Sequence, residues 1–248
     1  MTDLLLMLLI GAGPVAGTSP PSAAAAVDAT LTVRLPAGRA TYAIGELIPL
    51  ELEFRGQADA DYCFSTTPAD RLRSMGRERY AVTPAEGVDD PLSEYFSSVG
   101  VAGSVLSGWH PLDGTPLVLR VHLNEWVRFT RPGDYRLVLT SSRLERYSRR
   151  PAPPVVSEPV ALRIEPATPE WVADEAARAV ADAEGAGQEA RSHAVSILRH
   201  LGTRTAALAL VGLYGAGGEQ LRFDVTAGLV ASPYRAEVVK AMEARIDA

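Results

Sequence analysis

The period of the apolar residues changes once along the chain, and this change divides it into two parts. In LIPLELEF (47–54), leucine and phenylalanine alternate with glutamate, which is typical of a half-buried strand. In QEARSHAVSILRHLG (188–202), apolar residues instead recur every three to four positions, as on one face of a helix. The sequence therefore predicts a β part over residues 29–166 and a helical part over residues 168–248.

The β part is expected to be an antiparallel sandwich. Alternation recurs in LVLRVHL (117–123), YRLVLTS (135–141) and VALRIEP (160–166), and it is weaker at 31–35, 61–65 and 78–83. About seven short strands without long helices between them are typical of this architecture. Residues 84–116 interrupt the pattern as a long insertion, of the kind that often carries function. Within the insertion we expect a short helix over 91–96, with Asp90 as its cap and Pro91 as its first residue.

Two segments carry a resemblance to a known fold. In RFTRPGDYRLVL, Pro132-Gly133 predicts a tight turn in which the glycine takes a positive φ. Tyr135 then opens a strand, and this resembles the corner tyrosine of immunoglobulin-like sandwiches. YAIGELIPLELEF (42–54) resembles an early strand of bacterial Ig-like and macroglobulin-like modules. The resemblance implies an Ig-like sandwich for residues 29–166 and transfers no activity.

The helical part is predicted to hold about five helices joined by short turns. Thr168-Pro169, Thr203 and Ser232-Pro233 are start signals, and Gly202 is a stop signal. The segments around 194–203 and 228–242 resemble HEAT-type repeats. The whole chain resembles uncharacterised secreted bacterial proteins that join an Ig-like or macroglobulin-like sandwich to HEAT-like helices. Such repeats usually occur three or more together, whereas about two fit here. The helices are therefore expected to dock on the sandwich, or the chain is an N-terminal fragment of a longer HEAT-repeat protein.

The stretch LLLMLLIGAGPVAG (4–17) allows two interpretations. Gly11, Gly13 and Ala16 match the glycine pattern of a dinucleotide-binding turn. That turn needs a following helix, which Pro20 and Pro21 would end after about one turn. An apolar run followed by small residues favours a secretory signal over residues 1–26, although the first residues include no Lys or Arg. We therefore expect a periplasmic or secreted protein with no other membrane span, and cleavage or retention of the signal as an anchor stays open.

Charge and cysteine content exclude several classes of partner and site. The formal net charge of −6 argues against a nucleic-acid-binding protein, which would normally be basic. Cys63 is the single cysteine of the sequence, so an internal disulfide and a cysteine-based zinc site are excluded. We expect this thiol to be buried in a strand.

The remaining polar residues do not form a recognised catalytic or metal-binding motif. His193 and His200 lie seven positions apart, too far along a helix to share one metal ion, and packing or surface roles are expected for them. His122 alternates outward on its strand, so we expect it to be exposed. The basic and aromatic cluster over 143–150 is expected to be a solvated strand end. No cofactor is predicted, although calcium could bind acidic residues of the insertion, namely Asp89, Asp90, Glu94 and Asp113.

Aromatic residues of the insertion are the best candidates for binding a partner, because exposed aromatics supply much of the energy at interfaces. These residues are Trp109 and His110, together with Tyr95 and Phe96. We therefore expect an exported, non-enzymatic protein of the cell envelope that acts as a protein-binding or scaffold module. The alternative is a hydrolase or protease-associated module with its site in the insertion, where Ser104 and Ser107 lie near His110 in sequence.

Overall fold

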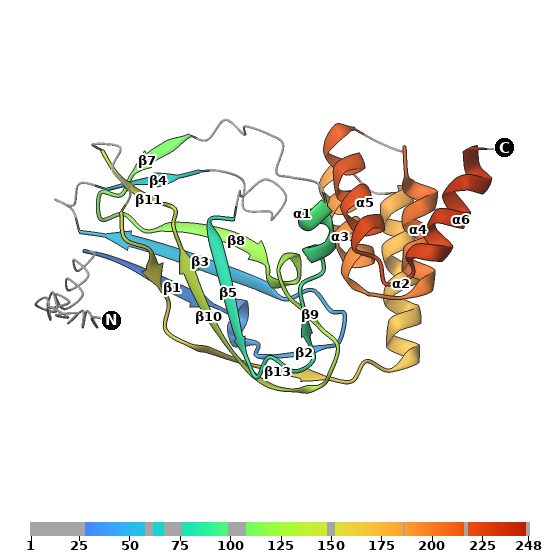
Figure 1. Ribbon diagram of the computed structural model, residues 1–248, viewed down its shortest axis with the longest axis horizontal. Helices are drawn as coiled ribbons and strands as arrows, with labels where there is room; N and C mark the ends of the chain where they lie inside the picture. Colours follow the sequence, from blue (N-terminus) through green and yellow to red (C-terminus); the bar gives the residue numbers. More distant parts are fainter. Residues whose placement is uncertain are drawn as a thin grey trace, which may run out of the picture.

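The computed structural model describes residues 28–57, 62–66, 76–98, 108–147, 152–185, 187–215 and 218–246. Mostly antiparallel β-sheets form the N-terminal part of this chain, and five helices follow them (Figure 1). The expected signal segment, residues 1–26, lies outside the described residues.

The described strands form four sheets, one of five strands, two of three and one of two. One three-stranded sheet has the order β1 (Ala29–Arg34), β3 (Pro49–Gly56), β8 (Leu117–His122). The five-stranded sheet has the order β12 (Val155–Val156), β10 (Gly133–Ser141), β13 (Val160–Glu165), β2 (Thr41–Ala43), and β5 (Glu78–Thr83) pairs with β10. A second three-stranded sheet has the order β11 (Leu144–Arg146), β4 (Tyr62–Ser65), β7 (Trp109–Pro111). The last sheet pairs β6 (Val88–Asp89) with β9 (Arg128–Phe129), and the short helical turns are η1 (Pro36–Gly38) and η2 (Leu123–Glu125).

The sheets share one hydrophobic core, to which alternate residues of each long strand contribute. Leu50, Leu52 and Phe54 of β3 are buried, as their alternation predicts. Trp126 is 9% exposed and its ring lies 4.6 Å from that of Tyr80, so this tryptophan is a core residue.

One pair of strands is parallel. β2 and β13 align Thr41 with Arg163 and Ala43 with Glu165 in the same direction, so the expectation of a wholly antiparallel arrangement is wrong at this edge. β13 leads directly to the first long helix. The pairing therefore places an N-terminal strand beside the point where the chain leaves the sheets.

The turn before β10 differs from the prediction in one respect. Gly133 is not among the described glycines with positive φ; it begins β10 and pairs with Ile164. A Cβ at Gly133 would lie 3.4 Å from the Tyr135 ring, which is van der Waals contact distance. The Tyr135 hydroxyl donates a hydrogen bond of 3.0 Å to the carbonyl of Arg131, four residues upstream.

The helices begin and end close to the predicted signals. They are α2 (Pro169–Gly185), α3 (Gln188–His200), α4 (Arg204–Leu213), α5 (Glu219–Ala231) and α6 (Arg235–Ile246). The hydroxyls of Thr168 and Thr203 accept hydrogen bonds from Trp171 and Ala206, three residues on, which is N-capping geometry. Gly202 has φ +66 just after α3, as a C-terminal stop requires. None of the described helices is long and apolar enough to cross a membrane.

The short helix of the insertion, α1 (Ser93–Ser98), begins two residues later than predicted. The Asp90 carboxylate accepts a hydrogen bond of 2.9 Å from the backbone of Leu92. Aspartate side chains often form such local turns with the backbone two residues on. The turn spans Asp90 to Leu92, so Pro91 lies before the helix and not in it.

The sheets and the helices meet along a packed junction (Figure 1). Leu47, in the loop between β2 and β3, packs against the hydrophobic core of the helices. Gly45 in the same loop has φ +84, and a Cβ there would lie 2.8 Å from the carbonyl oxygen of Leu201. Arg128 of β9 donates a hydrogen bond of 3.2 Å to the carbonyl of Ala231 at the end of α5. Backbone and side chains therefore both join the two parts.

Candidate functional site

The four candidate contact residues fall into two separate places. Trp109 and His110 lie on β7, at the end of the sheets far from the helices (Figure 1). Tyr95 and Phe96 lie on α1, beside the helices. The structure therefore does not bring these four side chains into one site.

The α1 pair belongs to the junction. Tyr95 and Phe96 are half-buried, and their rings meet edge to face with centroids 5.4 Å apart. Tyr95 lines a hollow of about 300 Å³ together with Arg128 and residues 230–233. Part of this pair's surface is therefore used within the molecule.

The β7 pair borders a hollow on the sheet formed by β11, β4 and β7. Its volume is about 430 Å³. The strand register places Pro111, Cys63 and Glu145 in one row across the sheet. The side chains that line the hollow are Cys63, Trp109, His110, Pro111, Glu145, Arg146 and Tyr147. Because three strands contribute, the hollow depends on the fold and not on one loop.

Two exposed aromatic side chains border this hollow. Trp109 is 42% exposed and Tyr147 is 55% exposed, although large aromatic residues are usually highly buried. The Arg77 guanidinium lies 5.7 Å from the centre of the Trp109 ring, at cation–π distance. Arg77 also lies 3.5 Å from a carboxylate oxygen of Glu145, so its charge is compensated in place. The tryptophan is thus held by a neighbour while much of its surface stays in solvent.

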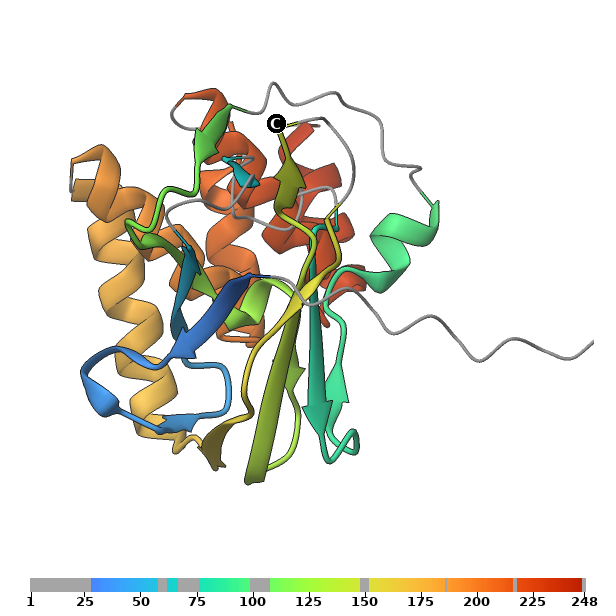
Figure 2. The same ribbon diagram turned by 90° about the vertical axis from the view of Figure 1, so that its left-hand side faces the viewer.

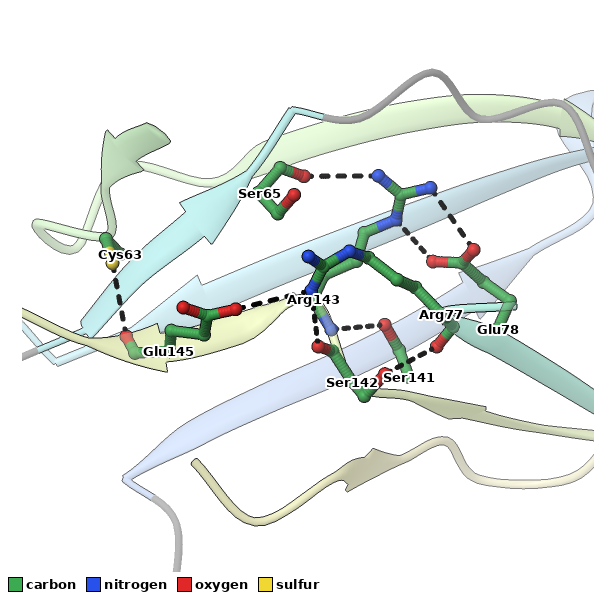
Figure 3. A network of polar contacts seen from close by, with 8 residues as sticks. All are labelled: Cys63, Ser65, Arg77, Glu78, Ser141, Ser142, Arg143 and Glu145. Carbon is green, nitrogen blue, oxygen red and sulfur yellow. Dashed lines mark hydrogen bonds and ion pairs between the residues drawn. The ribbon is translucent and has the colours of Figure 1, made fainter. Parts of the chain in front are cut away.

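A buried ion pair lies beneath this surface (Figure 3). The side chains of Arg143 and Glu78 are 0% and 1% exposed. The guanidinium donates through Nε and Nη2 to the two carboxylate oxygens, the second bond being 3.2 Å long. Nη1 donates to the carbonyl of Ser65 on β4 at 3.1 Å. A bidentate Arg–carboxylate pair has fixed geometry, so it ties β4 to β5 beneath the sheet that carries Trp109.

The burial of Arg143 corrects the expectation that residues 143–150 form a solvated strand end. Tyr147 fits that expectation, but Arg143 is wholly buried; Arg149 and Arg150 lie outside the described residues. Alternation along β10 continues from Leu139 through Ser141 to Arg143, so the sequence period itself places this arginine on the inner face. The alternation could therefore have predicted that Arg143 is buried. The many arginines of the segment favoured the opposite expectation, a solvated strand end.

Cys63 confirms the expectation of a buried strand thiol. It is 8% exposed, lies on β4, and donates from Sγ to the carbonyl of Glu145 at 3.4 Å. The thiol therefore links β4 to β11 at the base of the hollow.

A second polar cluster, which sequence reasoning missed, lies at the junction. Arg199 of α3 pairs with Glu125 of η2, and His200 lies 3.6 Å from the other oxygen of this carboxylate. His122 is half-buried beside them, so the expectation that it is exposed is wrong. It alternates away from the sheet core, as the sequence predicts, but His193, Arg199 and His200 of α3 are near enough to act on its charge. Burial and the positive field of His200 lower the pKa of His122 to about 4.

The expected calcium ligands and the candidate nucleophiles of the insertion can be compared with the described residues. Within that part of the chain, no group of three or more His, Cys, Asp or Glu side chains is placed to hold a metal ion. Asp113 accepts a hydrogen bond from the backbone of Thr115 at 3.2 Å, which lowers the pKa of its carboxyl. Ser104 and Ser107, the candidate nucleophiles of the hydrolase alternative, lie outside the described residues.

Comparisons with known proteins add no relative to these observations. No protein-family model matches the sequence, and no curated protein matches it. What defines the chain is therefore its architecture of β-sheets followed by five helices, together with the aromatic hollow at the far end of the sheets.

Proposed function

We propose that this chain is an exported, non-enzymatic cell-envelope protein that binds another protein through the hollow bordered by Trp109 and Tyr147. The observation that carries the proposal is the exposure of these two aromatics on one hollow, at 42% and 55%. Aromatic side chains that are rigid and only partly covered are the usual anchors of protein interfaces. The charged side chains of Arg146 and Glu145 beside them provide a polar rim.

The rigidity of the surface supports a recognition role. Arg77 holds one side of Trp109, and the Arg143–Glu78 pair fixes the strands below it. A surface that is ordered before binding loses less conformational entropy when its partner arrives. The hollow therefore suits an interface that forms without refolding of the sheet.

We further propose that the sheets form an Ig-like sandwich and that the helices are HEAT-like. The Tyr135 hydroxyl bonded to the Arg131 carbonyl has the geometry of the tyrosine corner of such sandwiches. The consecutive helices α2 and α3 pack on one another, and α4 packs on both α3 and α5, as stacked helical hairpins do. In this arrangement the helices would be a scaffold at one end and the aromatic hollow the contact surface at the other.

The binding proposal is tested by capturing envelope proteins on the immobilised full chain, with chemical crosslinking and mass spectrometry to map the sites. Trp109→Ala and Tyr147→Ala should each reduce capture of the crosslinked partner by about tenfold or more, the scale of an interface hot spot. Crosslinks should lie around residues 109–111 and 145–147.

Tyr214→Ala is the matched control, because Tyr214 is similarly exposed, at 40%, but lies at the end of α4. Equal capture by the parent and by Trp109→Ala would refute the proposed site. Export is tested separately by determining the N-terminus of the mature protein; an intact Met1 would contradict cleavage of the signal.

A further inference from the structure

The sheets and the five helices have separate hydrophobic cores. The two cores share no buried residue. Leu47 is the one described residue of the N-terminal part that packs against the core of the helices. The chain passes from the sheets to these helices once, through residues 166–168 between β13 and α2, at the lower edge of the junction in both views (Figure 1 and Figure 2). Each part therefore keeps most of its apolar contacts if the junction between them opens.

The junction itself is rich in ionisable side chains. Glu125 of η2 accepts a hydrogen bond from Arg199 of α3, and its other carboxylate oxygen lies 3.6 Å from Nε2 of His200. This ring nitrogen is buried and has no hydrogen bond in the part of the chain that the structure describes. We call the groups that act on one another here the junction cluster: His122 of β8, Glu125 of η2, His193, Arg199 and His200 of α3, and Asp224 of α5.

The carboxylates in and beside the junction cluster already have cations as partners. Glu125 and Asp224 share Arg199, at 2.9 and 3.8 Å. A small cavity beside Arg199 and His200 is lined by two further charged groups, each of which also has a partner. These are Glu46, which is paired with Arg39, and Arg128, which is paired with Asp89. A proton on either histidine therefore enters a buried site in which no described carboxylate is unpaired.

Burial sets the direction in which acid acts on the junction. It lowers the pKa of His200 more than the nearby Glu125 raises it. It also lowers the pKa of His122 to about 4, with the positive field of His200 as the second cause. An open junction would expose both rings to water, where the ordinary pKa is 6.5. The open form therefore binds more protons between pH 6.5 and 4, so acid favours opening. The same protons favour complete unfolding, but opening exposes less apolar surface and so costs less free energy.

We propose that the junction is an acid-sensitive contact: protonation of His122 and His200 releases the five helices from the sheets, while both hydrophobic cores stay folded. Residues 166–168 keep the released parts linked. The junction lies at the end of the sheets opposite to the Trp109 hollow, and the release does not depend on the proposed function of that hollow.

Small-angle X-ray scattering of the full chain between pH 7 and 4 tests the proposal, with circular dichroism and amide hydrogen exchange of the same samples. We expect the radius of gyration to rise as the pH falls from 6.5 to 4, while the far-ultraviolet signal stays constant. Relative to intrinsic exchange rates, amides of the two cores, such as those of Leu52 and Leu198, should stay protected. The molecule would thus expand without losing either core.

His122→Gln with His200→Gln should move the rise in the radius of gyration below pH 4.5. Glu125 then becomes the group that drives opening, because its pKa is lowered from 4.5 to about 2. His122→Gln alone should cause a smaller shift in the same direction. His110→Gln is the matched control, because His110 is exposed on β7 and lies far from the junction.

A radius of gyration that stays constant down to pH 4 would overturn the proposal. Loss of the far-ultraviolet signal in the same pH range as the expansion would show unfolding of the whole chain and would overturn it as well. Expansion of the double variant at the same pH as the parent would refute the role of the two histidines. An expansion that grows with protein concentration would show association instead of opening, and would also overturn the proposal.

Discussion

Arg199 of α3 holds the carboxylate of Glu125 at 2.9 Å across the junction between the sheets and the helices. The side chains are 4% and 9% exposed, so neither charge can be solvated in place. Asp224 of α5 lies 3.8 Å from the same guanidinium. One arginine therefore connects η2 with two helices.

Glu125→Gln should destabilise the protein by about 3 kcal/mol, because it leaves a buried guanidinium without its main partner. Burial opposes the ionised form of Glu125, but His200 and Arg199 still lower the pKa of this carboxyl to about 2. Urea unfolding at pH 7 measures the change. Glu51→Gln is the control, because Glu51 pairs with the exposed Arg120; a loss within about 1 kcal/mol is expected there. Equal losses in the free energy of unfolding for the two variants would show that the buried junction pair stabilises the protein no more than an exposed pair does.

Stability should fall as the pH is lowered from about 6.5 to 4. The pKa of His122 is about 4 in the folded protein, below the ordinary value of 6.5, and burial is the main cause. Between these values the unfolded chain binds a proton that the folded protein does not, so unfolding is favoured by up to about 3 kcal/mol. His200 is buried, and its pKa is also lowered, so it adds to the same slope.

Urea unfolding at a series of pH values tests this dependence. His122→Gln should reduce the slope between pH 6.5 and 4, and His122→Gln with His200→Gln should reduce it further. Glu125 titrates lower and does not enter this window, because its pKa is about 2. His110→Gln is the control, since His110 is exposed on β7 and far from the junction. An unchanged slope in the double variant would refute the assignment.

Arg143→Met should destabilise the β part by about 3 to 5 kcal/mol, because Glu78 would remain as a buried, unpaired charge. Arg143→Met combined with Glu78→Leu should recover a large share of that loss, since buried ion pairs can be replaced by apolar residues at little net cost. Thermal unfolding of the single and double variants measures the coupling. Additive losses would contradict direct pairing.

Gly45→Ala should cost about 3 kcal/mol, roughly 2 more than Gly38→Ala. Both glycines have positive φ, which strains alanine. A Cβ at Gly45 would also lie 2.8 Å from the Leu201 carbonyl oxygen, whereas nothing lies within 4 Å of one at Gly38. The difference between the two melting temperatures therefore isolates the junction contact. Equal shifts would mean that the loop moves away from α3 at little cost.

The features that the sequence predicts are those with local causes. Thr168 and Thr203 cap helices through residues three positions on, and β3 shows its buried face by alternation alone. The five helices of the C-terminal part and the burial of Cys63 follow from the same local rules.

The features that the sequence does not predict depend on partners far along the chain. His122 alternates outward from its sheet, but it is half-buried and lies within the electrostatic influence of residues of α3, which no period in β8 indicates. The candidate contact residues belong to one insertion of the sequence, yet the fold separates Trp109 from Tyr95. Tyr147, the second aromatic of the hollow, follows β11 and reaches it only through pairing of β11 with β4.

The parallel pairing of β2 with β13 has a consequence for the order of folding. It joins Thr41 to Arg163, roughly 120 residues apart, and closing so long a loop is entropically costly. The backbone of Ile44 then bonds to Glu165, directly before the loop that carries Gly45 to α3. The helices can fold through local contacts. The surface of the sheets on which they dock, however, forms only after β2 has paired with β13. We therefore expect docking of the helices to be a late kinetic step, slower than formation of the helices themselves.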